Sequence, residues 1–235
     1  MHISYSLHHF LQTLALIFPA FLLIFTFKGF FRALVAYSMG DETPFVAGFV
    51  SLNPLAHINL PTFLLLASLL SLPGFSFVIL LVLIFVLPLF GQPWYSPPVN
   101  HRNFRWYYGG VVLTALSESF ACILLAFFCL LFLQYVPTMI NDAKLLIPFI
   151  QISQHTIEYA LGFAVLHLIP IPPLSASDIW LLAGEDGEDL IRHVEPFGFL
   201  ILLVFLLVPG INSFAISFFS NFIFTLKSFL ISLIG

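Results

Sequence analysis

The sequence predicts an all-α protein, a polytopic bundle of membrane helices in a single domain over residues 1–235. Hydrophobic residues make up 60% of the chain and charged residues 8%, and the mean hydropathy is +1.08, so the chain has too few charges to cover a soluble surface. Most of the long apolar stretches reach the ~20 residues that a helix needs to cross ~30 Å of hydrocarbon. The alternating pattern of barrel strands is absent, which leaves helices as the membrane-crossing elements.

In the first half of the chain, apolar stretches and the residues that break them define the expected elements. A first helix is expected over residues 10–39, ended by Gly40. Residues 40–59 contain several breakers and are expected to be irregular, at the membrane surface. The apolar block 62–90 would be ~43 Å long as one straight helix. Because Pro73-Gly74 divides this block near its middle, a membrane hairpin is favoured over a single span.

The second half is expected to be mostly helical as well. The expected elements are, in order, a helix over 110–133, a helix over 145–168, a polar and acidic loop over 175–196, and C-terminal helices over 197–234. The prolines between Pro170 and Pro173 end the second of these helices, since proline cannot continue a helix. Pro209-Gly210 breaks the last apolar block.

Short motifs occur in a fixed order over roughly residues 20–205. They are GDETP at 40–44, LNPLAHI at 52–58, PVNHRNFR at 98–105, LIPIPPL at 168–174 and EPFGF at 195–199. This order resembles that of site-2 proteases, the intramembrane zinc metalloproteases of the M50 family. The resemblance implies a core of three membrane helices that converge around a zinc ion, to which this chain adds a membrane hairpin and C-terminal helices.

The residues that carry zinc chemistry in that family are replaced in this chain. The family's first core helix bears His-Glu-x-x-His, whose histidines bind zinc and whose glutamate activates water. The resemblance places Lys28, Gly29 and Arg32 at those positions, and Ser175 at the position of the third ligand, an aspartate. Two cations and a hydroxyl cannot replace the ligands of a divalent metal. The sequence therefore predicts no metal, no other cofactor and no catalytic residue.

The main functional prediction is a catalytically inactive homologue, not an enzyme, that acts as a partner-binding, regulatory or assembly subunit of a membrane protein complex. Its expected partners are other membrane proteins or transmembrane helices and the lipid bilayer. A net charge of −4 and the lack of a basic cluster argue against nucleic acid. Two alternatives are an active intramembrane metalloprotease with an unorthodox centre and a proton- or solute-conducting helper. The expected location is the inner (cytoplasmic) membrane of a bacterium.

Charged residues inside the predicted helices are candidates for a polar cleft. The charges of Lys28, Arg32, Glu118 and Glu158 sum to zero. An unpaired charge at the membrane centre costs ~2.5–3.5 kcal/mol on insertion scales, so we expect Lys28 or Arg32 to pair with Glu118 or Glu158. His167, where the family has an asparagine ahead of the proline run, is a further candidate.

A polar stripe adds further candidates on the helix expected over residues 145–168. Gln151, Gln154, His155 and Glu158 follow the spacing i, i+3, i+4, i+7 and therefore share one helix face. Such a stripe faces protein or water. It is interpreted either as a set of interhelical bonds that close the former zinc cavity, or as the lining of a cleft that grips a partner helix or conducts protons.

Overall fold

The computed structural model describes residues 2–70, 96–140, 142–172, 174–207 and 211–234. Within these ranges the regular elements are all helices, which confirms the predicted all-α class. Three helical segments are long and apolar enough to cross a membrane: Phe10–Ser38, Tyr107–Met139 and Ser217–Ile234. The chain is therefore an integral membrane protein.

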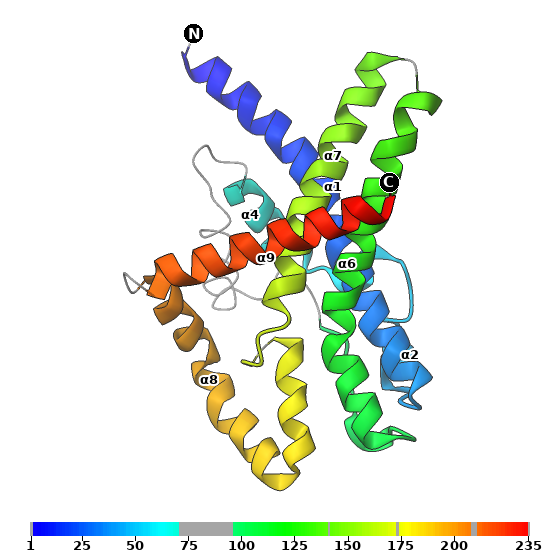
Figure 1. Cartoon of the computed structure of the whole chain (residues 1–235), viewed down its shortest axis with the longest axis vertical. Coiled ribbons are helices and arrows are strands. Elements are labelled where there is room, and N and C mark those ends of the chain that lie inside the picture. Colours follow the sequence, from blue (N-terminus) through cyan, green and yellow to red (C-terminus); the bar gives the residue numbers. More distant parts are fainter. Residues whose placement is uncertain (1, 71–95, 141, 173, 208–210, 235) are drawn as a thin grey trace.

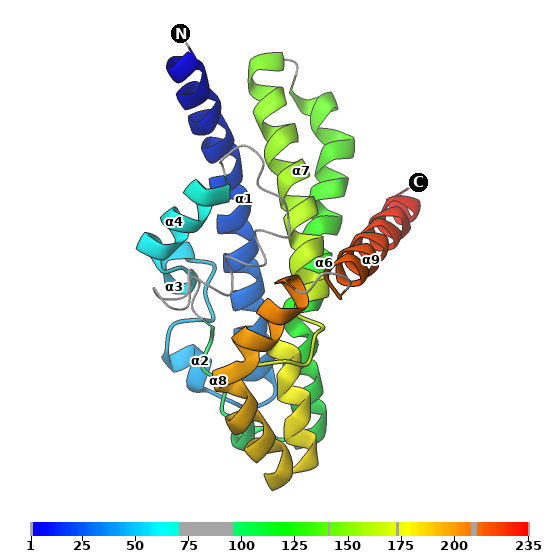
Figure 2. The same cartoon turned by 90° about the vertical axis from the view of Figure 1, so that its left-hand side faces the viewer.

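Three long helices, α1, α6 and α7, lie side by side along the long axis of the molecule (Figures 1 and 2). The elements are α1 (His2–Ser38), α2 (Thr43–Val46), α3 (Pro54–His57), α4 (Leu60–Leu70), the 3₁₀ helix η2 (His101–Asn103), α6 (Tyr107–Met139), α7 (Ala143–Leu166), the 3₁₀ helix η3 (Ser175–Ala183), α8 (Glu185–Leu207) and α9 (Ile211–Ile234). The short helices α2, α3 and α4 lie along α1, and α9 crosses the bundle at a steep angle while contacting α7 and α8.

The hydrophobic core lies where α1, α6 and α7 meet. Phe21 and Phe25 of α1 are buried there, and Phe25 packs edge-on against Phe163 of α7 with ring centroids 5.4 Å apart. The facing helices contribute buried alanines, Ala126 on α6 and Ala160 on α7. Because alanine is small, the helix backbones can approach closely, as membrane helices do when packing replaces the hydrophobic effect as the driving force.

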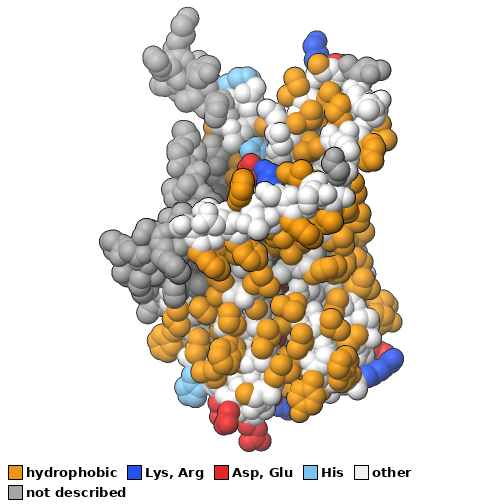
Figure 3. All heavy atoms as spheres, in the orientation of Figure 1, with side chains coloured by type: hydrophobic (Ala, Val, Ile, Leu, Met, Phe, Trp, Pro, Cys, Tyr) orange, Lys and Arg blue, Asp and Glu red, His pale blue; other side chains and the backbone are white. Residues whose placement is uncertain are grey.

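The outer surface fits a membrane environment. Figure 3 shows apolar side chains spread over much of one face, with acidic side chains gathered at its lower end. On α6, Leu113, Leu116 and Phe120 are exposed large apolar side chains. Such residues would be costly to expose to water but are suited to contact with lipid tails.

The stretch 175–196, predicted to be a loop, is instead helical. The 3₁₀ helix η3 occupies its first part, and α8 begins at Glu185 after the single residue Gly184, whose φ of +70° favours glycine. Glu185 and Asp186 lie in the first turn of α8, where carboxylates interact favourably with the positive end of the helix dipole. The acidic composition therefore marked a helix start.

Two predicted features fall largely outside the described residues. The membrane hairpin was predicted over residues 62–90, of which α4 covers the first part to Leu70, while the proposed break at Pro73-Gly74 lies within the undescribed residues 71–95. The predicted break at Pro209-Gly210 lies within residues 208–210, which are also not described.

Asp41 fixes the surface segments at the end of α1. Its side chain is fully buried and accepts four hydrogen bonds, from Thr43 N at 3.1 Å, Thr43 Oγ1 at 2.6 Å, Asn100 N at 2.7 Å and Asn103 Nδ2 at 3.0 Å. Burial disfavours the ionised form, yet these donors hold the pKa of Asp41 below its ordinary value. Residues 40–59, expected to be irregular, are thus anchored at their start, and they include the short helices α2 and α3.

Candidate functional site

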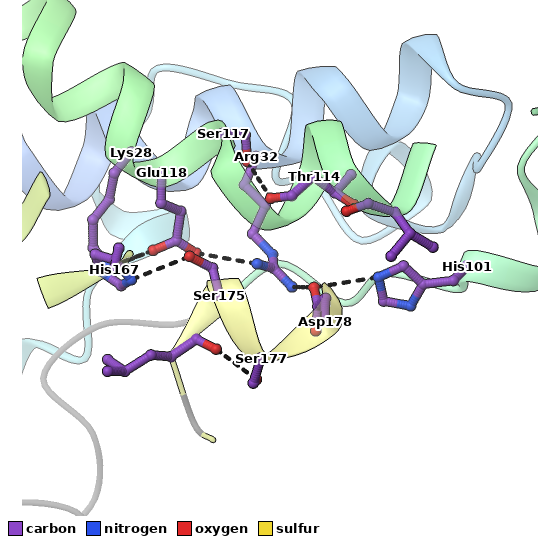
Figure 4. Close-up of polar contacts among 12 residues, drawn as sticks. Lys28, Arg32, His101, Thr114, Ser117, Glu118, His167, Ser175, Ser177 and Asp178 are labelled. Carbon is purple, nitrogen blue, oxygen red and sulfur yellow. Dashed lines mark hydrogen bonds and ion pairs between the residues drawn. The ribbon is translucent and has the colours of Figure 1, made fainter. Parts of the chain in front are cut away.

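A buried polar cluster lies at the junction of α1, α6, α7 and η3 (Figure 4). Lys28 and Arg32 project from α1, where their i, i+4 spacing puts them on one face. Glu118 comes from α6, His167 from the end of α7 and Ser175 from the start of η3. All five side chains belong to residues that are at most 7% exposed. The structure thus gathers the predicted replacements of the zinc ligands around one carboxylate.

Glu118 is the centre of this cluster. Lys28 Nζ donates a hydrogen bond to Glu118 Oε2 at 2.8 Å, and Arg32 Nη1 lies 3.7 Å from Oε1. His167 Nε2 lies 3.1 Å from Oε2 and 3.0 Å from Lys28 Nζ. The predicted pairing of a cation on α1 with Glu118 is therefore present, and each charge offsets the cost of desolvating the other.

A second ion pair extends the cluster towards the surface. Arg32 Nη2 donates to Asp178 Oδ2 at 2.7 Å, and His101 Nε2 lies 3.3 Å from the same oxygen. Side-chain exposure rises from 5% for Glu118 to 9% for Arg32 and to 17% for Asp178. Burial opposes ionisation of Asp178, but Arg32 and His101 hold its pKa below the ordinary value. Neither Asp178 nor His101 is among the residues predicted from the sequence.

The polar stripe on α7 lies apart from the cluster. Gln151, Gln154 and Glu158 are exposed and His155 is half-buried, because the packed face of this helix carries other residues, Ser153, Thr156, Ile157 and Ala160. Glu158 forms no ion pair with any described residue. The expected pairing therefore holds for Glu118 alone, and a cleft role for the stripe stays a prediction.

His57 fills the space beside Gly29. The imidazole is fully buried, and its Nε2 lies 2.7 Å from the carbonyl oxygen of Ser51, so Nε2 must carry the proton. A Cβ atom at position 29 would collide with Nδ1 of this ring. Burial lowers the pKa of His57, and the nearby charge of Lys28 acts in the same direction, which keeps the ring neutral. A glutamate at position 29 would need the space that His57 occupies.

Gly29→Ala should lower the free energy of unfolding by about 1–3 kcal/mol, the usual cost of overpacking a core. The added methyl group has to displace the buried His57 ring, whose Nε2 donates to the carbonyl oxygen of Ser51. Equilibrium unfolding in detergent measures the change. In the double variant Gly29→Ala/His57→Ala the loss should be smaller than the sum of the two single losses, and strictly additive losses would contradict the contact.

The cluster does not fit a zinc ion. A zinc site takes three or four ligands from His, Cys, Asp and Glu. Across the described ranges, no group of three such side chains lies close enough to share a metal. The side chains of this centre that could ligate a metal are Glu118 and His167. The ammonium of Lys28 lies 2.8 Å from Glu118 Oε2 and 3.0 Å from His167 Nε2. Lys28 and Arg32 would repel a divalent cation at this place.

Comparison with known proteins finds a metalloprotease-like relative. The chain is 28% identical over 189 residues to the candidate zinc metalloprotease YwhC of Bacillus subtilis (strain 168), and the match covers 79% of this chain and 77% of YwhC. No family model matches the chain. No solved structure matches it with significance.

This similarity corrects the functional prediction. The prediction of a non-enzymatic, inactive subunit rested on the lost zinc ligands at Lys28, Arg32 and Ser175. Similarity over most of the chain to a protein named as a zinc metalloprotease points towards a protease and against an inactive homologue. The physical reason for the error is that losing one metal site does not remove every group able to hydrolyse a peptide bond. The alternative of an active intramembrane metalloprotease with an unorthodox centre fits this similarity better.

Proposed function

We propose that this chain is a membrane-embedded protease of the site-2-protease type, with a centre that departs from the zinc pattern. The observation that carries the proposal is the buried cluster of Lys28, Glu118, His167 and Ser175, in a chain similar to YwhC over 79% of its length. Peptide hydrolysis needs a group that moves protons and charges that stabilise the developing oxyanion. Together with Arg32, the cluster offers an imidazole, a carboxylate, a hydroxyl and two cations.

Hydrolysis needs water at the cluster. The outer ion pair, Arg32 with Asp178, supports hydrolysis because it connects the buried cluster to less buried polar side chains. Polar contacts run from Glu118 through Arg32 and Asp178 to the half-buried His101 (Figure 4), and side-chain exposure rises from 5% at Glu118 to 17% at Asp178. The rings of Phe25 and Phe163 also lie beside Lys28, with centroids 5.8 and 5.9 Å from its Nζ. Proton conduction needs a polar path from both sides, whereas hydrolysis needs access from one. The two apolar rings packed beside Lys28 therefore favour proteolysis over the conducting alternative.

The proposed substrates are transmembrane helices of other proteins, in the inner membrane of a bacterium. α6 presents exposed apolar side chains, including Leu116 and Phe120, close in sequence to Glu118. A substrate helix could pack on such a surface within the bilayer. Its scissile bond would become accessible only where the helix unwinds, because every backbone group inside lipid is otherwise hydrogen-bonded.

Cleavage of a set of fluorophore-labelled single-span peptides by the purified chain in liposomes tests the proposal. Mass spectrometry of the products should locate cleavage inside the membrane segment. His167→Gln should slow it by at least ~100-fold, the low end of the contribution of a proton-transferring group. Glu158→Gln, on the exposed face of α7, is the matched control and should retain the wild-type rate. The proposal is wrong if the folded wild-type chain cleaves none of the peptides, or if His167→Gln cleaves as fast as wild type.

A further inference from the structure

We infer that the stretch 43–57 between α1 and α4, named here the connecting segment, dips into one leaflet of the bilayer without crossing it. Its large exposed side chains are apolar: Phe45 is 56% exposed, Val46 80%, Leu52 60% and Leu55 68%. The segment contains no Asp, Glu, Lys or Arg, and its one histidine, His57, is fully buried. Apolar surface of this kind is costly in water and is favoured in contact with acyl chains.

The position of the connecting segment along α1 gives its depth (Figures 1 and 2). The span Phe10–Ser38 has 29 residues and is ~43 Å long, so ~7 Å of a centred span lies beyond the ~30 Å of hydrocarbon at each end. Phe45 stacks on Tyr37 near the end of this span. The ring of His57 lies beside Gly29, which is ~14 Å before the span ends. The segment therefore runs from the headgroup region at α2 to ~7 Å inside the hydrocarbon at α3, a depth typical of interfacial elements.

Local hydrogen bonds satisfy backbone groups of the connecting segment. In α2 and directly after it, the N–H groups of residues 46–49 donate to carbonyl oxygens within residues 42–45. At the start of α3, Asn53 N donates to Ser51 Oγ at 3.0 Å and Leu55 N donates to Asn53 Oδ1 at 3.1 Å. These bonds lower the cost of placing a segment that does not span the membrane in lipid, where no water is present to bond the backbone.

The chemistry of the connecting segment favours lipid over a protein partner. The side-chain oxygens of Ser51 and Asn53 accept bonds from the segment itself, and the segment carries no charge for a partner to match. Its apolar surface also continues that of the membrane span, because the ring of Phe45 stacks on the exposed Tyr37 with centroids 5.2 Å apart. Acyl chains cover such a surface without directional bonds, whereas protein interfaces have a polar rim. The occupant is therefore the acyl chains of the adjacent leaflet.

Nitroxide labels on single cysteines in liposomes test this depth, in a chain whose two native cysteines are replaced by alanine. Collisions with oxygen, which enters hydrocarbon, are compared with collisions with a polar nickel complex, which does not. The oxygen-to-nickel ratio for Leu55→Cys should be at least ~10-fold that for Asp186→Cys, at the acidic start of α8. It should be similar to that for Phe120→Cys, on the exposed face of α6. Val46→Cys should give an intermediate ratio, because α2 lies nearer the headgroups.

The unsubstituted chain supplies a second measurement that does not depend on the variants. Phospholipids with a diazirine in the acyl chain, activated by light in liposomes, should leave adducts within residues 49–57 and none within residues 185–190, as located by peptide mass spectrometry. Absence of adducts from 49–57, or a Leu55→Cys ratio as low as that of Asp186→Cys, overturns the inference. Low collision rates of Leu55→Cys with both reagents also overturn it, because another protein surface, such as a second copy of this chain, would then cover the segment.

Discussion

Glu118→Gln should lower the free energy of unfolding by about 3–5 kcal/mol, because it strands the buried charge of Lys28. Lys28 Nζ loses its 2.8 Å ion pair, and Arg32 Nη1 loses a carboxylate 3.7 Å away. Equilibrium unfolding in detergent micelles measures the loss. Glu158→Gln removes a carboxylate of the same type from the exposed face of α7 and should leave stability unchanged. Equal stability of both variants and wild type would show that the buried pair does not hold these helices together.

Adding Lys28→Met to Glu118→Gln should restore part of the lost stability. The double variant removes the stranded ammonium, while Arg32 keeps its 2.7 Å bond to Asp178. Removing both members of a buried pair leaves neutral surface, which costs less than leaving one charge alone. A double variant as unstable as the sum of the two single variants would contradict the coupling of the two charges.

Asp41→Ala should cost about 3–4 kcal/mol, because donors from three residues lose a fully buried carboxylate partner. The same unfolding measurement should show this loss of free energy of unfolding. The substitution should loosen residues 40–46 and 100–103 together. Asp142→Ala is the matched control. Asp142 is exposed and caps α7 through one bond to Lys144 N, so its removal should cost about 1 kcal/mol. Equal losses of stability in Asp41→Ala and Asp142→Ala would contradict the anchoring role of Asp41.

The side chain of Asp41 should also make the stability of the fold sensitive to acid. The pKa of Asp41 is lower in the folded chain than the ~3.9 of an unperturbed aspartate, so folding favours the ionised form. Its contribution to stability is complete above the unfolded value and is lost as the pH falls towards the folded value. Asp178, whose pKa is also lowered, acts in the same direction. Stability should therefore fall below about pH 4, and less steeply in Asp41→Asn.

The long membrane helices could be predicted because apolar length is a strong signal. The expected helix at 110–133 corresponds to Tyr107–Met139, and that at 145–168 to Ala143–Leu166. The ends of these helices differ from the predicted ones, because proline does not end a helix at every position. Pro137 lies inside the last turn of α6, and Pro148 is the sixth residue of α7, so both helices continue past a proline although each proline removes one intrahelical hydrogen bond.

The pairing of Lys28 and Arg32 with Glu118 could be predicted from the cost of burying charge. The contacts of Asp178 with Arg32 and His101 could not. Lys28 and Arg32 needed a carboxylate, and Glu118 was within reach of the same helix junction. Asp178 was not predicted as a partner of Arg32, and its segment was interpreted as a loop. In a 3₁₀ helix residues three apart lie on one face, so a helical reading of η3 would have put Asp178 beside Ser175 and facing Arg32.

The stripe on α7 shows the limit of periodicity. The spacing of Gln151, Gln154 and Glu158 predicts a shared face, which the structure has, but it does not say what that face contacts. The opposite face carries Ala160 and Ala164, whose small side chains allow close packing with neighbouring helices. Close backbone approach, rather than polarity, decided which face is buried.

The zinc content of the cleavage-competent chain tests a metal-independent centre most directly. Purified protein that cleaves membrane peptides in liposomes is analysed for bound metal and then assayed with and without a chelator. We expect far less than one zinc per chain and a cleavage rate that the chelator does not change. About one zinc per chain, with cleavage lost on its removal and regained on its return, would contradict a metal-independent centre.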